Sequence, residues 1–200
     1  MPRTVPPRSP SGAPGRAPHE IRIIGGQWKR TRLPVADKPG LRPTPDRVRE
    51  TLFNWLGRDL TGWRCADVFA GTGALGFEAA SRGAADVLLV EQDAGLVAQL
   101  RALTSKLQAT AVKVERGNGL TVLQRLVPGS VDLVFLDPPF EAGLYGKALS
   151  AAAPALSPAG LVYLEAGSAW TDPQLAEFGL AEHRHMRAGA VHAHLLRRAA

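Results

Sequence analysis

The chain has 200 residues, a net charge of +6 and one cysteine. This size fits one domain with a sizeable core, and a single cysteine excludes an intrachain disulfide. No apolar run reaches eighteen residues and the start lacks the apolar core of a signal peptide, so we expect a soluble cytoplasmic protein that is neither membrane-inserted nor secreted.

The charge is distributed unevenly along the chain. Residues 1–64 carry 13 Lys and Arg against 5 Asp and Glu, whereas residues 65–200 carry 11 against 13. A basic front on a near-neutral body predicts that the front engages a polyanion, although a solvated basic face would give the same count.

Residues 1–20 hold six of the sixteen prolines together with Arg3, Arg8 and Arg16. Such a segment cannot bury enough apolar surface to form a core, so we predict a disordered, basic, proline-rich tail.

Residues 21–33 place apolar and cationic side chains on either side of Gly25 and Gly26. The pattern predicts two short strands joined at the glycines. One aromatic and three cationic side chains would lie on the second strand, a combination suited to a nucleic-acid backbone: Trp28, Lys29, Arg30 and Arg32.

Residues 44–56 predict a helix, with Thr44 as N-cap and Pro45 at the first helical position. Val48, Leu52 and Leu56 recur at helical spacing and indicate a packing face. Three arginines of this region are left to face outward or toward a ligand: Arg42, Arg47 and Arg49.

Residues 67–78 predict a strand, a tight glycine loop and a helix. Gly71, Gly73 and Gly76 fit the pattern G-x-G-x-x-G, in which the first two glycines permit a sharp turn close to a ligand and the third permits close helix packing. We expect amides at the helix start to face an anionic ligand group. Ordinary turns also produce this spacing, so the loop alone does not decide between a ligand site and a structural turn.

Residues 86–91 predict a second buried strand that ends in Glu91, twenty residues after Gly71. In a doubly wound α/β fold, an acid at this point binds ribose hydroxyls. Asn118 follows the third predicted strand at the same edge, where it can contact a ligand or cap the next helix.

Residues 131–140 predict a buried strand that ends in Asp137, Pro138, Pro139 and Phe140. Because the carboxyl ends of parallel strands share one crevice, this segment should lie beside the glycine loop. The prolines lack amide donors and stiffen the backbone, which leaves carbonyl oxygens as acceptors. An acid, a rigid acceptor and an aromatic plane suit a flipped base with an exocyclic amine; the alternative is a proline-stiffened turn.

From residue 64 onward, strands and helices alternate, which predicts a parallel sheet with helices on both faces. Cys65, at the start of the first of these strands, is expected to pack in the core. The predicted strands are 64–69, 86–91, 111–116, 131–137 and 160–165, and the predicted helices are 74–83, 94–108, 119–127 and 144–153.

Residues 180–187 and 190–198 flank Ala188 and Gly189 and predict an antiparallel hairpin at the sheet edge. A turn at these two residues would place His185 opposite His192 and His183 opposite His194. No carboxylate or thiolate shares that face in this register, so we predict no metal site.

The glycine loop, the acid that ends the next strand and the D-P-P-F segment together resemble class I methyltransferases that use S-adenosylmethionine and act on an amino group of a base. Residues 21–29, 40–55 and 69–76 are similar to the RsmD family. Members of that family methylate the exocyclic amine (N2) of a guanine in bacterial small-subunit (16S) ribosomal RNA. The resemblance runs from Ile21 to the C-terminal hairpin, and only residues 1–20 look like an addition.

The resemblance implies an α/β, Rossmann-like class I methyltransferase fold: a mostly parallel seven-stranded sheet with an antiparallel C-terminal hairpin, plus a small N-terminal β-hairpin and helix. It divides the chain into the tail (1–20), an RNA-contacting front (21–62) and an S-adenosylmethionine-dependent methyltransferase domain (63–200). We expect a monomer whose partner is 16S rRNA within a small ribosomal subunit or its assembly intermediate, with no membrane partner.

The resemblance also implies roles for single positions. The target amine would be held by Asp137, Pro138, Pro139 and Phe140. S-adenosylmethionine would be held by Asp67, Phe69, Ala70, Gly71, Thr72 and Gly73 at its methionine end, by Glu91 and Gln92 at the ribose, and by Asn118 at the adenine amine. RNA would be contacted by Lys29, Arg30, Arg32, Arg42 and Arg47.

Three other functions would use some of the same features. A DNA adenine-N6 methyltransferase shares the D-P-P-F segment, but no sequence-reading domain is recognisable. A nicotinamide oxidoreductase shares the glycines and the acid, but hydride transfer has no use for a proline-stiffened amine clamp. A non-catalytic RNA-binding or assembly factor would bind S-adenosylmethionine without transferring a methyl group.

Overall fold

The structure, a computed structural model, describes residues 20–38, 43–139 and 143–199. Two of the predicted site residues, Arg42 and Phe140, and the predicted tail up to residue 19 lie outside these ranges.

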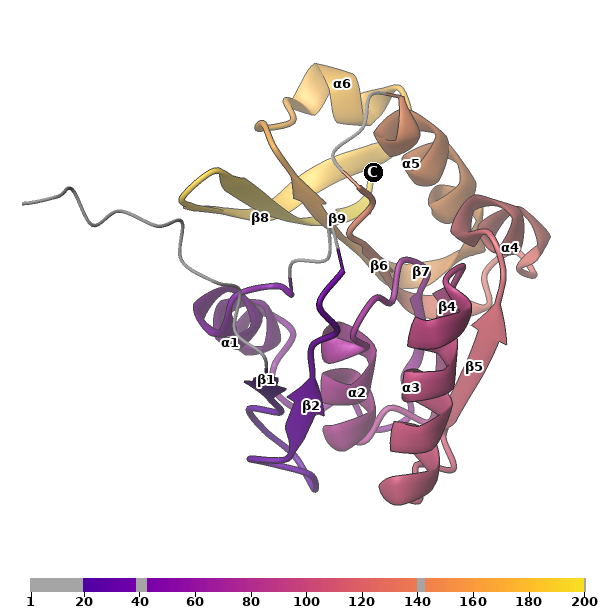
Figure 1. Cartoon of the computed structure of the whole chain (residues 1–200). Coiled ribbons are helices and arrows are strands. Elements are labelled where there is room, and N and C mark those ends of the chain that lie inside the picture. The colour runs from indigo at the N-terminus through magenta and orange to yellow at the C-terminus, as the bar shows by residue number, and fades with distance from the viewer. Residues whose placement is uncertain (1–19, 39–42, 140–142, 200) are drawn as a thin grey trace, which may run out of the picture.

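A seven-stranded sheet with the strand order β5-β4-β3-β6-β7-β9-β8 forms the centre of the fold (Figure 1). The first five strands of this order pair in parallel, and β9 pairs antiparallel with both β7 and β8. The predicted mostly parallel sheet with a C-terminal hairpin is therefore confirmed. Its strands are β3 (Arg64–Asp67), β4 (Asp86–Glu91), β5 (Val112–Arg116), β6 (Val131–Leu136), β7 (Leu156–Ala166), β8 (Leu180–Ala188) and β9 (Val191–Arg198).

Helices cover both faces of the sheet, as the alternating pattern predicts (Figure 1). On one face pack α1 (Asp46–Trp55), α2 (Ala74–Ser81) and α3 (Ala94–Lys106), and on the other α4 (Gly119–Arg125), α5 (Leu144–Ala155) and α6 (Asp172–Ala176). The sequence did not predict α6, because a five-residue helix is too short to show a periodic apolar pattern.

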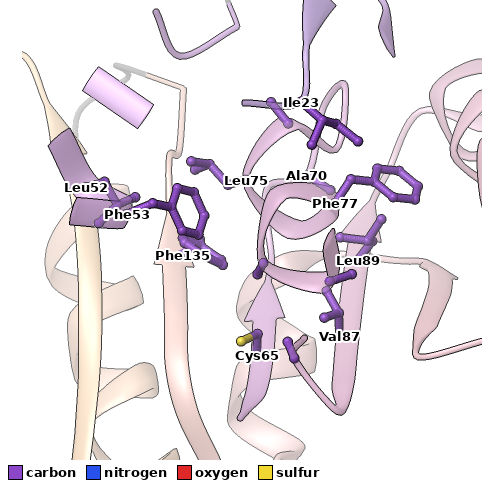
Figure 2. Close-up of a cluster of buried hydrophobic side chains, with 14 of the residues drawn as sticks. Ile23, Leu52, Phe53, Cys65, Ala70, Leu75, Phe77, Val87, Leu89 and Phe135 are labelled. Atoms are coloured by element: carbon purple, nitrogen blue, oxygen red, sulfur yellow. The ribbon is translucent and has the colours of Figure 1, made fainter. Parts of the chain in front are cut away.

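Apolar side chains of α1 and of the central strands form one continuous core. Figure 2 shows Phe53 of α1 beside Phe135 of β6, and their ring centroids are 6.3 Å apart. Cys65 is buried in the same cluster, and burial raises the pKa of its thiol to about 12. The prediction that this cysteine is a packing residue is confirmed.

The front differs from the predicted hairpin. Its two strands, β1 (Glu20–Arg22) and β2 (Arg32–Pro34), are only three residues long, so Trp28, Lys29 and Arg30 lie in the connecting turns and not on the second strand. The amide groups of Gln27 and Trp28 donate to Ser81 of α2. Because these donors are satisfied by a helix, the segment does not need a strand ladder.

Two expectations about α1 were wrong. The N-cap is Pro45 rather than Thr44, which is buried. Arg49 faces neither solvent nor a ligand: its side chain is fully buried and donates to the carbonyl oxygens of Arg22 at 2.9 Å and Thr44 at 3.2 Å and to the Asp46 carboxylate. The guanidinium is buried because the front folds over it and supplies these acceptors.

Glu78 of α2 fastens the front to the body. Its fully buried carboxylate accepts hydrogen bonds from the amides of Ile24 at 2.7 Å and Gly25 at 2.8 Å, which are more than fifty residues away in the sequence. Positive charge comes from Arg82, at 2.8 Å, and from buried Arg49, at 3.7 Å. A buried carboxylate is tolerated only with such partners.

The predicted register of the C-terminal hairpin was also wrong. Ala188 pairs with Val191, so the turn is Gly189-Ala190, one residue later than expected, and Gly189 has a φ of +64°. This shift places His185 opposite His194, and an irregularity between Glu182 and Arg184 takes His183 out of the ladder.

None of the helices within the described ranges combines the length and apolarity needed to cross a bilayer.

The Glu78 contacts lead to a stability prediction. Glu78→Ala should lower the free energy of unfolding in urea by about 3–5 kcal/mol, because it removes the buried carboxylate that opposes Arg82 and Arg49 and leaves two amides without an acceptor. The matched control is Glu20→Ala, which breaks the exposed pair with Arg32 and should cost less than about 1 kcal/mol. Equal losses in the two variants would show that Glu78 does not hold the front.

Candidate functional site

The strand order reverses between β3 and β6, and this reversal opens a crevice at the carboxyl ends of the strands. Asp67 is the last residue of β3, Glu91 is the last residue of β4, and Asp137 follows the last residue of β6. The topology therefore brings the three predicted acids to one edge of the sheet.

The glycine loop has the shape that the sequence predicts. Gly71 and Gly73 adopt positive φ values of 50° and 76°, which side chains with a Cβ rarely adopt. A Cβ on Gly76 would lie 2.1 Å from Leu89 Cδ2 of β4. The first two glycines therefore make the turn, and the third lets α2 pack closely on the sheet.

Two amides of the loop and the helix start are bonded to carboxylates of the protein itself. The Gly71 amide donates to Glu91 Oε2 at 3.0 Å, and the Gly76 amide donates to Asp67 Oδ2 at 3.1 Å. The protein's own carboxylates have taken the donors that would otherwise bind a phosphate. As a result, the loop lies in negatively charged rather than positively charged surroundings.

Asp67 is the most deeply buried of these three acids. Burial raises its pKa to about 7, and the negative charges of Glu91 and Glu165 act in the same direction, against the opposing hydrogen bonds from the Gly76 and Phe69 amides. A positively charged ligand beside Asp67 would favour its ionised form.

Glu91 ties the loop to the neighbouring strand. Its Oε1 accepts from the amides of Gln92 at 2.8 Å and Asp93 at 2.9 Å, in addition to the Gly71 bond to Oε2. A carboxylate offers about four acceptor positions, so the half-buried Glu91 can still accept from a hydroxyl group.

Asn118 caps α4, the second of the alternatives that the sequence left open. Its side-chain oxygen accepts from the Thr121 amide at 3.2 Å. The Gly117 amide donates to the Glu91 carbonyl at 3.0 Å, which holds this exposed asparagine at the same edge as Glu91. One acceptor position of Asn118 is occupied by the cap, so its amide NH₂ is the group best placed to meet a ligand.

The segment after β6 presents a rigid acceptor surface. Asp137 is half-buried, Pro138 is buried and Pro139 is exposed. Burial, together with the negative charges of Glu165 and Asp67, holds the pKa of Asp137 well above its usual range.

Sequence reasoning missed Glu165, a fourth acid at this edge. It is only 3% exposed and accepts a hydrogen bond from the Tyr163 hydroxyl at 2.9 Å. Burial raises its pKa, against opposing effects of Thr44, Tyr163 and Arg49. The paired residues Leu136 and Leu164 directly precede Asp137 and Glu165 on neighbouring strands. The signal was present in the sequence, since Glu165 ends the predicted strand 160–165 and lies one residue before the end of β7.

The other predicted ligand residues lie at the same loop. Thr72 and Ala70 are buried, Phe69 is half-buried in the core beneath the crevice, and Gln92 is exposed beside Glu91.

The cationic residues of the front are not gathered at the crevice. The turn with Lys29 and Arg30 is bonded to Ser81 at the far end of α2, about 12 Å from the glycine loop for an eight-residue helix. Arg32 forms an exposed ion pair with Glu20 at 3.1 Å. Arg49 carries a positive charge that acts on Glu165, and exposed Arg47 lies in the first turn of α1, three residues after Thr44, whose side chain bonds to Glu165.

Several known proteins are similar to this chain in sequence and in fold. A family model described as "Conserved hypothetical protein 95" matches residues 21–197. "Ribosomal RNA small subunit methyltransferase D" of Escherichia coli K12 is 48% identical over 132 residues, which cover 66% of each chain, or just under two thirds of the relative's length. The protein of the same name from Haemophilus influenzae is 42% identical over 73% of this chain and 78% of its own. The solved structure of Escherichia coli yhhF matches with a TM-score of 0.78 and 38% identity, covering 90% of this chain and 98% of that one.

The raised pKa of Asp67 leads to a pH prediction. Because its folded pKa of about 7 exceeds the usual value near 3.8, ionisation is harder in the folded state, so its contribution to stability is largest at low pH. The free energy of unfolding of the wild type, relative to Asp67→Asn, should therefore fall between pH 4 and pH 7, by up to about 4 kcal/mol for a shift of about three units. The measurement is urea titration of both variants from pH 4 to pH 7. If the difference between their free energies of unfolding stays constant over this range, the pKa of Asp67 is not raised.

Proposed function

Because the chain belongs to the family described as Conserved hypothetical protein 95, and its sequence resembles the RsmD family, we propose that it transfers a methyl group from S-adenosylmethionine to the exocyclic amine (N2) of a guanine in 16S ribosomal RNA. The names of the Escherichia coli and Haemophilus influenzae relatives support an rRNA substrate. The observation that carries the proposal is the crevice edge, where four acids and a proline-stiffened segment offer acceptors.

The charge of the crevice fits this cofactor. S-adenosylmethionine carries a positively charged sulfur and an amino group. Binding of these groups would be favoured by four neighbouring acids: Asp67, Glu91, Asp137 and Glu165. A nicotinamide cofactor instead brings a pyrophosphate, which needs amide donors. The Gly71 and Gly76 amides are already bonded to carboxylates, and this argues against the oxidoreductase alternative.

We assign the cofactor contacts by position along the edge. Asp67 and the loop from Phe69 to Gly73 would hold the methionine end, Glu91 with Gln92 the ribose, and Asn118 the adenine. When bound, the cofactor supplies an activated methyl group, so the protein's main task is to align the target amine and exclude water.

The target amine would be held at the end of β6. A guanine amine is a poor nucleophile because its lone pair is delocalised into the ring. Acceptors at the Asp137 carboxylate and the Pro138 carbonyl would favour a pyramidal nitrogen and stabilise its developing positive charge. Phe140, outside the described residues, is proposed as the stacking plane for the base.

Glu165 is proposed as a positioning residue for Asp137. Its negative charge raises the pKa of Asp137, which makes Asp137 a better acceptor for the proton that the amine must lose. Thr44 and Tyr163 hold the Glu165 carboxylate in place. The front would therefore contribute to catalysis through Thr44 as well as to RNA binding.

The proposal extends to the RNA partner and its contacts. We assign 16S rRNA in a small ribosomal subunit, or in an assembly intermediate, as the partner of a cytoplasmic monomer. The division into residues 1–20, 21–62 and 63–200 would then separate tail, RNA-contacting front and methyltransferase domain. Arg47 and Arg42 would lie closest to the reacting base, and Lys29, Arg30 and Arg32 would contact more distant phosphates.

The roles of the two acids can be separated by kinetics. Asp137→Ala should leave the affinity for S-adenosylmethionine nearly unchanged and lower the single-turnover rate about a hundredfold to a thousandfold, since an acceptor in a water-poor site is typically worth about 2.7–4 kcal/mol. Glu165→Gln should lower the rate less and move the acidic limb of the pH–rate profile to lower pH, because Asp137 loses the neighbour that raises its pKa.

The control for these variants is Asp132→Ala. Asp132 lies near the opposite end of β6 and pairs with Arg64 at 3.0 Å, so its loss should change neither the rate nor its pH profile. Wild-type rates for Asp137→Ala would remove Asp137 from the site. An unshifted profile for Glu165→Gln would reduce Glu165 to a structural role.

The substrate itself is tested by product analysis. With a labelled methyl donor, the full chain should label small-subunit ribosomal RNA, and nucleoside digestion should yield guanine methylated on N2. Methyladenine in DNA would instead support the DNA methyltransferase alternative. Cofactor binding without transfer to naked RNA, mature subunits or assembly intermediates would support the non-catalytic assembly factor.

A further inference from the structure

The tip of the β8–β9 hairpin carries a cluster of three histidines outside the crevice. His185, His192 and His194 each offer one ring nitrogen, and these nitrogens all lie within 4.8 Å of one another. The register predicted from the sequence paired His185 with His192 and His183 with His194. The one-residue shift of the turn and the irregularity after Glu182 bring these three together.

The backbone explains why the three rings lie side by side. His192 and His194 are two residues apart on β9 and therefore share one face of the sheet. His185 is the direct cross-strand partner of His194, and their rings stack with centroids 4.3 Å apart. Two ligands from one strand and a third from its neighbour form a compact set on a rigid hairpin.

His194 is held as a metal-binding histidine usually is. It is fully buried, and its Nδ1 lies 2.7 Å from a Glu182 carboxylate oxygen. Its Nε2 lies 3.3 Å from the Trp170 amide. Since the amide can only donate, the lone pair is on Nε2 and the proton on Nδ1 points to Glu182. An ion bound at Nε2 would take the place of the Trp170 amide, whose contact of 3.3 Å is the longer of the two. A carboxylate that fixes the tautomer in this way is the common outer partner of histidine ligands.

The other two rings are already at ligand spacing. His185 Nε2 and His192 Nδ1 are 3.0 Å apart, whereas two nitrogens bound tetrahedrally to zinc at about 2.0–2.1 Å are about 3.3 Å apart. His185 is exposed and His192 half-exposed, so both can turn toward His194 and close the remaining gap of about 1.5 Å. Arg187 shares this face, but its guanidinium is drawn to the turn, where it donates to the Gly189 carbonyl at 3.0 Å.

We propose that His185, His192 and His194 bind one divalent transition-metal ion of the zinc class, with Glu182 as the outer partner of His194 and water completing the coordination. Three imidazoles are a ligand set that zinc accepts, whereas calcium and magnesium prefer oxygen. This replaces the expectation of no metal site, which depended on a register that excluded Glu182.

The site would act on the hairpin rather than on methyl transfer. A bound ion would cross-link β8 to β9. Glu165 of the crevice is paired with Ala193, and His192 and His194, on either side of Ala193, point to the opposite face of the sheet. We therefore expect metal binding to stabilise the fold and to leave the cofactor site unchanged, so this proposal and the proposed function can fail separately.

The test uses the full chain without an affinity tag and Zn²⁺ as the only ligand. Zn²⁺ binding is measured by competition with a chromophoric chelator at neutral pH. The absorption spectrum of bound Co²⁺ is a second measurement. The wild type should bind one ion per chain, show the visible bands of tetrahedral Co²⁺ and melt at a higher temperature when Zn²⁺ is added. His192→Ala should abolish all three effects, and Glu182→Gln should weaken binding about tenfold to a hundredfold.

The matched control is His183→Ala, which removes the fourth histidine of the hairpin, outside the cluster, and should bind Zn²⁺ like the wild type. Circular dichroism of metal-free His192→Ala should match that of the wild type, since the side chain is half-exposed. No saturable binding by the wild type would overturn the proposal. Equal losses in His183→Ala and His192→Ala would also overturn it, because they would show only general adsorption to histidines.

Discussion

Two buried carboxylates link helix α2 to its surroundings, Asp67 near the start of the helix and Glu78 on the helix itself, and both the crevice and the front depend on them. At its start, Asp67 accepts the Gly76 amide and so fixes the glycine loop above β3. Further along, Glu78 accepts two amides of the front and opposes the charges of Arg49 and Arg82. One eight-residue helix thus joins the loop that faces the ligand to the segment that covers the sheet.

The same constraint sets the sign of charge in the crevice. Each loop amide bonded to an internal carboxylate is one donor fewer for a phosphate, and each buried carboxylate adds negative charge in a medium that screens it poorly. The raised pKa values of Asp67 and Asp137 are the outcome of this confinement. Such a crevice favours a cation and an amine that donates hydrogen bonds, which are the two parts of the proposed reaction.

Much of the fold and part of the site could be predicted from the sequence, because periodicity and strand ends are local properties. The alternation of strands and helices fixed the sheet, and β4 was predicted to the residue. Contacts across long distances could not be predicted: the burial of Arg49, the turns around Lys29 and the amide bonds of Glu78 all depend on how the front folds over α2. The hairpin register failed because a turn shifted by one residue moves every cross-strand partner by two positions, and the irregularity after Glu182 turns Glu182 and His183 to the other face. Glu165 was missed although its strand end was predicted, because its importance appears only when Thr44, Tyr163 and Asp137 are seen around it.

The central claim is that the crevice is built for a positively charged nucleoside cofactor, and calorimetric titration of the full chain with S-adenosylmethionine and, separately, with NAD tests it most directly. The account predicts one S-adenosylmethionine bound per chain, with a proton released on binding near pH 7 as Asp67 ionises, and no measurable binding of NAD. Preferential binding of NAD, or binding of S-adenosylmethionine that is unchanged in Asp67→Asn and releases no proton, would contradict it.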